Sequence, residues 1–419
     1  MKIKTLTTAC GAPLYVVEMP HLQSVISGVL VKVGTRDEYW PQEAGLAHAF
    51  EHMVFRGNAR FSDSRSLSSA IENLGGHLNA YTNKEQTFFY NRLPKNQFRE
   101  AFPHLASLID TPLFPESAIP LEMQTVLEEI KQYNDDPEAV VGLVAEELLF
   151  GPNHLARNVL GTSEAVSNFN DNDFQHWREE LYHPYRFCFF VVGNVRADEM
   201  LESVNASFGG YPHGKLIFRH HADLVTLSEN QSPQQTLKIV HRDVEQLKVC
   251  LLAKVPVSFN SESVALGFYA KMISSGMSSP LFQEVREKRG LCYSVGASKY
   301  SYSSDGVFSI SIGTSPEKFS QALETIFAVI AENAANKDLF EKTKEKVYGI
   351  TSIHYDDPFN ILNKIVEEAI VLGAPETVEK SLEKIHNISL DRVKEAVEKY
   401  LQRDRFVTAI VAPRGFKLS

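Results

Sequence analysis

The residues best suited to do chemistry in this chain are His48, Glu51 and His52, within the segment 44–55. Apolar residues surround them at helical spacing, so the segment is predicted to form one buried helix. On a helix His48 and His52 lie one turn apart on the same face, where two imidazoles can hold one zinc ion. The Glu51 carboxylate would lie over the same spot, as metal-assisted hydrolysis requires. The spacing therefore predicts a hydrolytic zinc site, although a histidine pair on a helix can also be a hydrogen-bonded structural pair.

A third ligand must come from elsewhere, because a catalytic zinc usually has three protein ligands and an open fourth position. The segment 117–133 is a candidate, since Pro120 suits the first turn of a helix and apolar residues recur at helical spacing. Glu122 and Glu129 share one face of this helix. Glu128, the residue before Glu129, is turned from that face by one residue around the helix axis. Such an acidic run is usually a solvated face. Here the helix is predicted to be mostly buried, so we expect its acidic face to meet a cation.

Other elements must position these residues. Two glycines followed by alternating residues predict a β-hairpin in the segment 74–90. His77, in its first strand, is a metal ligand by type, but a lone histidine in a strand is more often a surface or core residue. The apolar run that ends at Gly193 predicts a buried strand. In the second half, Gly290 is expected to end a charged helix, and Tyr293 to begin the next strand.

Together these motifs resemble the pitrilysin/insulinase family of zinc metallopeptidases, the inverzincins, whose H-x-x-E-H motif matches residues 48–52. The resemblance is greatest to bacterial processing peptidases and to the beta subunit of the mitochondrial processing peptidase. It implies one zinc ion per chain, with Glu129 as the third ligand. Glu122 would support the site without binding metal, and Glu128, one residue off register, is the second choice of ligand. Manganese and cobalt bind similar ligands and stay open as the native metal.

The resemblance also assigns substrate contacts. It implies that a substrate adds as an extra strand to the first strand of the hairpin. The residues expected there are Gly76, Leu78, Asn79, Ala80 and Tyr81. Arg286 and Tyr293 match an arginine–tyrosine pair that reaches the substrate and stabilises the tetrahedral intermediate. The segment 274–280 departs from the family, which often has a glycine run and a basic residue there. The segments 155–162, 182–184 and 187–195 match the family, with no chemistry assigned to them.

The length of 419 residues predicts two domains. We place a zinc-binding peptidase domain at 1–215, a linker at 216–235, and a peptidase-like domain with the Arg286/Tyr293 pair at 236–419. Both halves open and close with strands and have helical patterns between them, which suggests an internal duplication. The predicted fold class is α+β: two similar α/β domains, each a mainly antiparallel sheet packed with helices. The resemblance implies the pitrilysin/insulinase type, which is LuxS-like and processing-peptidase-like.

Composition excludes several classes of protein. The net charge of −10 argues against a nucleic-acid partner. No apolar run approaches the roughly 20 residues of a membrane span, and no secretory signal is predicted. The four cysteines are widely spaced in apolar surroundings, so we expect reduced core residues and a cytoplasmic protein.

The expected function is zinc-dependent endopeptidase activity on peptides or unfolded segments inside a closed chamber, with Glu51 as the general base toward a zinc-activated water. The chain carries one zinc motif and one arginine–tyrosine pair. By resemblance, such a chain forms a homodimer, in which Arg286 and Tyr293 of one protomer face the zinc of the other. One alternative is a non-catalytic structural or regulatory subunit, although such relatives usually lose part of the motif. Another is a peptide-binding or carrier module with a structural zinc. That site would need a fourth ligand, commonly cysteine, and none lies near the motif.

Overall fold

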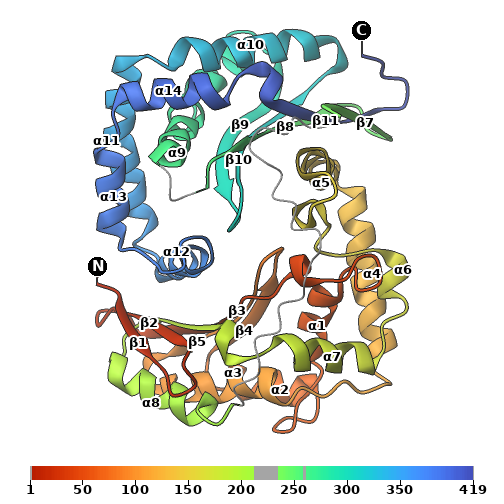
Figure 1. Cartoon of the computed structure of the whole chain (residues 1–419), viewed down its shortest axis with the longest axis vertical. Coiled ribbons are helices and arrows are strands. Elements are labelled where there is room, and N and C mark those ends of the chain that lie inside the picture. The colour runs from red at the N-terminus through yellow and green to blue at the C-terminus, as the bar shows by residue number, and fades with distance from the viewer. Residues whose placement is uncertain (1, 212–234, 258–260, 419) are drawn as a thin grey trace. The chain divides into compact units, whose positions relative to one another are not determined.

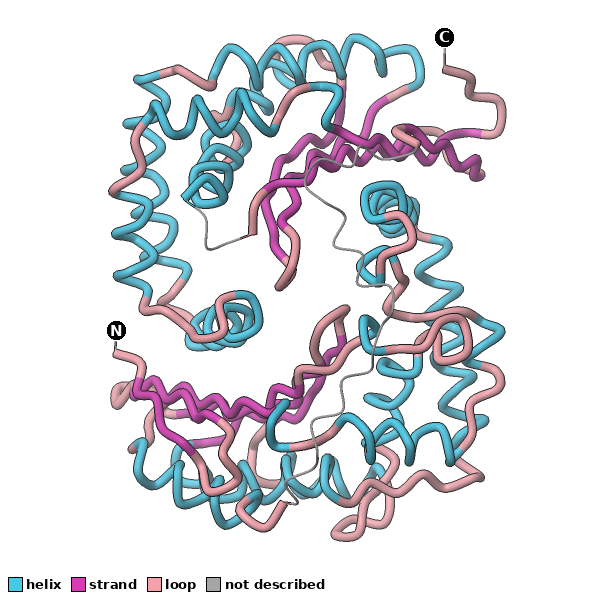
Figure 2. Tube along the Cα trace, viewed as in Figure 1, coloured by secondary structure: helices cyan, strands magenta, loops and turns pink. Residues whose placement is uncertain are grey.

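The computed structural model describes residues 2–211, 235–257 and 261–418 (Figure 1). Within these residues the chain forms two compact units. The first unit comprises 2–131, 157–211 and 355–378; the second comprises 132–156, 235–257, 261–354 and 379–418. Of the predicted linker, 216–234 lies outside the described residues. Helices pack against a mainly antiparallel sheet in each unit, which confirms the predicted α+β class (Figure 2).

The sheet of the first unit has six strands in the order β1-β2-β6-β3-β5-β4. All neighbours are antiparallel except β2 and β6, which are parallel. The strands are β1 (Lys4–Thr7), β2 (Pro13–Glu18), β3 (Ser24–Val31), β4 (His77–Thr82), β5 (Thr87–Pro94) and β6 (Phe187–Gly193). The strand β6 is buried along its whole length, as its continuous aromatic and β-branched sequence predicts. The predicted hairpin is present as β4 and β5, and β4 forms one edge of the sheet.

Helices cover both faces of this sheet. The helices of the first unit are α1 (Leu46–Val54), α2 (Ser64–Glu72), α3 (Ala101–Asp110), α4 (Ile119–Asp135), of which residues up to 131 belong to this unit, α6 (Ser163–Val166), α7 (Asp171–Leu181), α8 (Ala197–Phe208) and α12 (Pro358–Val371). One face packs against α1, α3 and α8 in the main hydrophobic core. The other face packs against the apolar side of α12. The predicted helix around His48 is therefore α1, and it is anchored in the core.

The second unit repeats this plan with five strands in the order β7-β11-β8-β10-β9. The strands are β7 (Leu237–Arg242), β8 (Leu247–Val255), β9 (Cys292–Ser301), β10 (Gly306–Thr314) and β11 (Phe406–Pro413). The helices are α5 (Pro137–Phe150), α9 (Ser261–Ser274), α10 (Phe319–Asn333), α11 (Lys337–His354), α13 (Val378–His386, of which Val378 falls in the first unit) and α14 (Leu390–Tyr400), with a π-helical turn η5 (Phe282–Glu287). One face of the sheet packs against α9, α10 and α14, and the other against α5.

The two sheets have the same topology. Omitting β1, the parallel pair β2/β6 corresponds to β7/β11, and the antiparallel series β6-β3-β5-β4 corresponds to β11-β8-β10-β9. The edge strand β4 of the first unit therefore has β9 as its counterpart. This agreement in strand order and direction supports the internal duplication that the alternating strands and helices suggest.

Each half of the chain also gives one helix to the other unit. The helix α5 lies in the first half of the sequence but packs against β8 and β11, whereas α12 lies in the second half and packs against β3 and β6 (Figure 1). Both helices start in the same way, at Asp136-Pro137 and Asp357-Pro358, where the aspartate side chain accepts a hydrogen bond from the backbone two residues on. Proline suits this first helical position, so both starts are well defined. The predicted division at 1–215 and 236–419 stays a prediction; the compact units cross it through these two helices.

No helix among the described residues is both long and apolar enough to cross a bilayer. The cytoplasmic location stays a prediction.

Candidate metal centre

The helix α1 presents its polar residues on one side. Its apolar side chains are buried in the core of the first unit, which fixes the helix on the sheet. The rings of His48 and His52 lie edge to face with their centroids 4.6 Å apart. The helical spacing seen in the sequence therefore brings the two imidazoles together as predicted.

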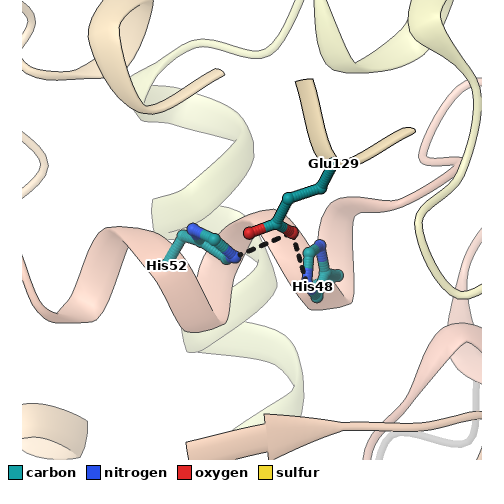
Figure 3. Close-up of side chains that lie close together, drawn as sticks. All are labelled: His48, His52 and Glu129. Carbon is teal, nitrogen blue, oxygen red and sulfur yellow. Dashed lines mark ion pairs between the residues drawn. The ribbon is translucent and has the colours of Figure 1, made fainter. Parts of the chain in front are cut away.

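Glu129, from α4, completes a group of three possible metal ligands (Figure 3). Its Oε2 lies 3.6 Å from Nε2 of His48 and 3.6 Å from Nε2 of His52. These separations are too long for good hydrogen bonds. They are close to the roughly 3.3 Å that separates two ligand atoms of one tetrahedral zinc, each about 2.0–2.1 Å from the metal. The two nitrogens and one oxygen form a donor set that fits zinc.

The state of His48 also fits a metal ligand. Burial, together with the neighbouring His52, lowers the pKa of His48 to about 3. The imidazole is then neutral near pH 7, and a neutral imidazole has one nitrogen lone pair to offer a metal. Its contact with Glu129 is accordingly not an ion pair. The Nδ1 atom of His48 is buried and has no hydrogen-bond partner among the described residues.

Glu51 lies on the same helix, and a residue of the sheet orients its side chain. Its Oε2 accepts a hydrogen bond of 2.7 Å from the Thr82 hydroxyl, at the end of the edge strand β4. Burial raises the pKa of Glu51 and the charge of Glu129 adds to this rise, whereas the bond from Thr82 opposes it. A carboxylate with a raised pKa beside a metal-ligand group is suited to accept and return a proton.

The other two glutamates of α4 lie outside this group. Glu122 is buried, and its Oε1 lies 2.8 Å from Nδ1 of His52, while its Oε2 contacts the guanidinium of Arg56. Glu128 is exposed and accepts hydrogen bonds from Lys131 and Gln124. The structure thus places Glu129 with the histidines and Glu122 behind one of them. Glu128, the second choice of ligand, is directed to solvent.

The residues predicted to bind substrate lie on and beside an open strand edge. Leu78, Asn79, Ala80 and Tyr81 belong to β4, and Gly76 directly precedes it. Among the described residues β4 pairs on one side only, with β5. The Asn79 side chain accepts a hydrogen bond of 2.9 Å from the backbone N–H of Ala80. The strand packs beside α1, and the bond from Thr82 to Glu51 joins the two elements. His77, at the other end of β4, is exposed and is not part of the ligand group.

The structure also brings together Arg286 and Tyr293, within the second unit. The Arg286 guanidinium carbon lies 5.2 Å from the centre of the Tyr293 ring and 4.7 Å from that of Phe282. Tyr293 is 74% exposed, although it is a large aromatic residue. Gly290, with φ of 57°, follows the helical turn η5 as expected, and Tyr293 lies at the start of β9.

Sequence reasoning missed the residues that hold the beginning of α1. Glu38 is fully buried, and its carboxylate accepts hydrogen bonds from the backbone N–H groups of Gly45 and Ala47, at 3.1 and 3.0 Å. These amides open the helix and have no partner within it. Burial raises the pKa of Glu38 well above its ordinary value, and the two amide donors oppose this. No local spacing rule links Glu38 to α1, because helix caps are normally sought next to the helix.

The segment 155–162, which had no assigned chemistry, supports the same helix end. Arg157 donates a hydrogen bond of 2.7 Å to the backbone oxygen of Glu38 and stacks over the ring of Trp40. Gly161 packs so closely that an added Cβ would lie 2.0 Å from the backbone oxygen of Ala44. Its φ of 72° also favours glycine. The segment therefore has a structural role beside the beginning of α1.

Comparisons with known proteins find two matching family models. Residues 16–163 match the family described as insulinase (peptidase family M16), and residues 168–347 match the peptidase M16 inactive domain. The first match contains the three ligand candidates, and the second contains Arg286 and Tyr293. An uncharacterized zinc protease of Mycobacterium leprae is 30% identical over 98% of this chain and 92% of its own length. The uncharacterized zinc protease YmxG of Bacillus subtilis is 28% identical over 99% of both chains.

Solved structures share the fold. A protease from Helicobacter pylori has a TM-score of 0.88 at 18% identity and covers 98% of this chain and 99% of its own. A peptidase M16 inactive domain from Pseudomonas fluorescens also has a TM-score of 0.88 at 18% identity, over 100% and 99% of the two chains. Their likeness concerns the fold alone. Together with the sequence matches along nearly the whole chain, it leads to one conclusion: this protein belongs to the insulinase family of peptidases, family M16.

Proposed function

We propose that this protein is a zinc-dependent endopeptidase that cleaves peptides or unfolded segments. The observation that carries the proposal is the meeting of His48, His52 and Glu129 beside the buried carboxylate of Glu51. The names of the relatives support zinc as the metal and protein as the substrate class.

The three ligand candidates would hold the zinc through two imidazole nitrogens and one carboxylate oxygen, as catalytic zinc sites commonly do. When bound, zinc would supply a Lewis acid that polarises the scissile carbonyl and makes water more acidic. Three protein ligands leave a coordination position open for these reactants. Manganese and cobalt would suit the same donors.

Glu51 would act as the general base. It would accept the proton of the attacking water and later deliver it to the leaving amine. The Thr82 hydroxyl, 2.7 Å from Oε2, fixes the direction of the carboxylate. Because Thr82 belongs to β4, the same strand that orients the base would also receive the substrate.

The substrate would bind as a strand added to the edge of β4. Backbone hydrogen bonds to such an edge give affinity for any extended peptide, and side-chain pockets give selectivity. A folded protein has few free strands of this kind, so peptides and unfolded segments fit best. The sequence resemblance further supports a closed chamber and a processing-peptidase-like enzyme.

Arg286 and Tyr293 would stabilise the negative charge that develops on the substrate oxygen, since a cation and a hydroxyl donor act in this way. They belong to the second unit, and the ligand candidates belong to the first. By resemblance to larger family members, we propose a homodimer in which each site takes this pair from the partner chain. Two-fold dimers are the commonest homo-oligomers.

The alternative is a non-catalytic subunit, in line with the name of the family domain that matches residues 168–347. That match leaves out the segment with His48, Glu51, His52 and Glu129. The match therefore covers none of the residues proposed to hold the metal or to act as the base.

Hydrolysis of a quenched fluorescent peptide tests the proposal. The Glu51→Gln variant should keep its zinc, because Glu51 is not a ligand, and should lose about 10²–10⁴-fold in rate. The matched control is Glu72→Gln, an exposed glutamate of the same unit, which should match the wild type. Wild-type turnover by the Glu51 variant at full zinc content would remove Glu51 from the mechanism. No turnover by the zinc-loaded wild type would favour the non-catalytic alternative.

A further inference from the structure

The two histidines of the ligand group are supported in different ways. Nδ1 of His48 is buried without a hydrogen-bond partner among the described residues, whereas Nδ1 of His52 lies 2.8 Å from Glu122. Glu122 is therefore a polar support behind the His52 ring that the His48 ring does not have among the described residues.

That group is a chain of contacts that ends at Arg56. Glu122 uses its Oε1 toward His52, and its Oε2 contacts both Nε and Nη2 of Arg56. The Glu122 side chain is 6% exposed, and that of Arg56 is 28% exposed. Both contacts join α1, or the turn directly after it, to α4, which also carries Glu129.

The contact between Glu122 and His52 determines which nitrogen of His52 carries the proton. An ionised carboxylate offers acceptors only, so a hydrogen bond from His52 to Glu122 needs the proton on Nδ1. In a neutral imidazole the lone pair is then on Nε2, the atom 3.6 Å from Glu129. The arrangement therefore directs the lone pair of His52 toward the other ligand candidates.

Arg56 supplies the positive charge that allows the buried Glu122 carboxylate to accept the hydrogen bond from His52. A buried carboxylate without a positive partner is costly, and Glu122 is buried. The guanidinium balances this charge, and its planar fork also fixes the plane of the carboxylate. Most exposed ion pairs contribute little, but here the anion is almost completely buried.

We propose that Arg56 is a positioning residue for the metal ligand His52, acting through Glu122. The proposal rests on the proposed function, since it takes the His48, His52 and Glu129 group to be the metal site. Residues that orient a metal-bound histidine typically change metal affinity by about 10–100-fold when they are replaced. Arg56 should have an effect of this size although its ion pair is with Glu122 and not with Glu129, the acidic ligand candidate.

Zinc affinity, measured by competition with a chromophoric chelator, tests the proposal without any activity assay. Arg56→Gln should raise the zinc dissociation constant about 10–100-fold. Arg56→Lys should recover part of the loss, since lysine keeps the charge and loses the fork. The matched control is Arg60→Gln, which removes an exposed arginine paired with Glu100 at 3.4 Å and should leave zinc affinity unchanged.

A double-mutant cycle shows whether Arg56 acts through Glu122. In a Glu122→Gln background, Arg56→Gln should cost little further zinc affinity, because the group through which it acts is already lost. The unfolding temperature of each metal-free variant shows whether the fold is kept. If Arg56→Gln binds zinc like the wild type, or if its loss adds fully to that of Glu122→Gln, the proposal is wrong. If zinc binding by the wild type does not depend on His48 and Glu129, the proposed function itself fails.

Discussion

At the scale of single residues, Glu128 and Glu129 show how much a register of one residue matters. The two carboxylates are neighbours in the chain, yet only Glu129 faces the histidines, and Glu128 bonds to Lys131 at the surface. Spacing on a predicted helix placed Glu129 and Glu122 on one face. The choice between Glu128 and Glu129 as the ligand rested on resemblance, because the rotation of α4 depends on its packing.

Exchanging these two carboxylates for amides gives a matched test. Glu129→Gln should sharply lower the zinc content of the purified protein, because an amide oxygen is a weaker ligand than a carboxylate. Glu128→Gln should keep wild-type zinc content, since its side chain is in solvent. Metal analysis that shows the reverse would mean that the register is off by one. If neither variant loses zinc, the third ligand lies elsewhere.

The histidine pair and Glu51 could be predicted from the sequence because their spacing lies within one helix. The contacts of Glu122 with His52 and Arg56 could not, because they join α1 to α4 across many residues of chain. For the same reason, Thr82 could be assigned to the hairpin but not to Glu51. Local period determines which side chains share a face; tertiary packing determines what meets that face.

At the scale of elements, the candidate metal site depends on where α1 begins. Its N-cap residue is Gly45, which has no side chain to receive the first amides, and Glu38 receives two of them instead. His48 lies in this first turn, so the start of the helix and the position of a ligand candidate are coupled.

Glu38→Gln should therefore destabilise the metal-free protein. The amide keeps one acceptor oxygen but turns an N–H donor toward the helix amides, so a buried hydrogen bond is lost at a cost of about 1–3 kcal/mol. Urea denaturation measures this loss. The control is Glu43→Gln in the same loop, whose carboxylate accepts from the exposed backbone N–H of Tyr39 and should matter less. Equal losses in the two variants would contradict a special role for Glu38 at the start of α1.

The elements themselves were largely predictable. The helix around His48, the hairpin at β4 and β5, the buried strand β6 and the helical turn before Gly290 all follow from period and turn residues. The destinations of α5 and α12 were not, because an apolar helix face does not tell which sheet it will cover. The repeated Asp-Asp-Pro at 135–137 and 356–358 is the sequence signal that marks the two exchanged helices as counterparts.

At the scale of the whole molecule, the two similar units can be compared position by position; within the described residues, the group of possible metal ligands lies in the first unit. When the two Asp-Asp-Pro turns are aligned, Ile350 of α11 takes the place of Glu129, and Thr343 takes that of Glu122. The second unit therefore has the scaffold without these carboxylates. Instead it carries Arg286 and Tyr293, so the two units of the duplication have different side chains for chemistry.

The proposed homodimer can be tested by mixing two inactive variants. Glu51→Gln and Tyr293→Phe protomers should each be nearly inactive alone. After subunit exchange, each heterodimer has one site with both groups intact, so about a quarter of wild-type activity should return. Fluorescence transfer between labelled protomers confirms that exchange has occurred. A mixture that exchanges and stays inactive would contradict the shared site, as would a monomeric mass by light scattering in the active state.

The most direct test of the central claim is a zinc titration of the metal-stripped protein, followed by hydrolysis of a quenched fluorescent peptide. Activity should be lost with the metal and should return in proportion to added zinc, up to one zinc per chain. The His48→Ala chain should not recover. Undiminished hydrolysis by protein shown by elemental analysis to be free of metal would contradict the claim, and so would a chain that binds one zinc and cleaves nothing.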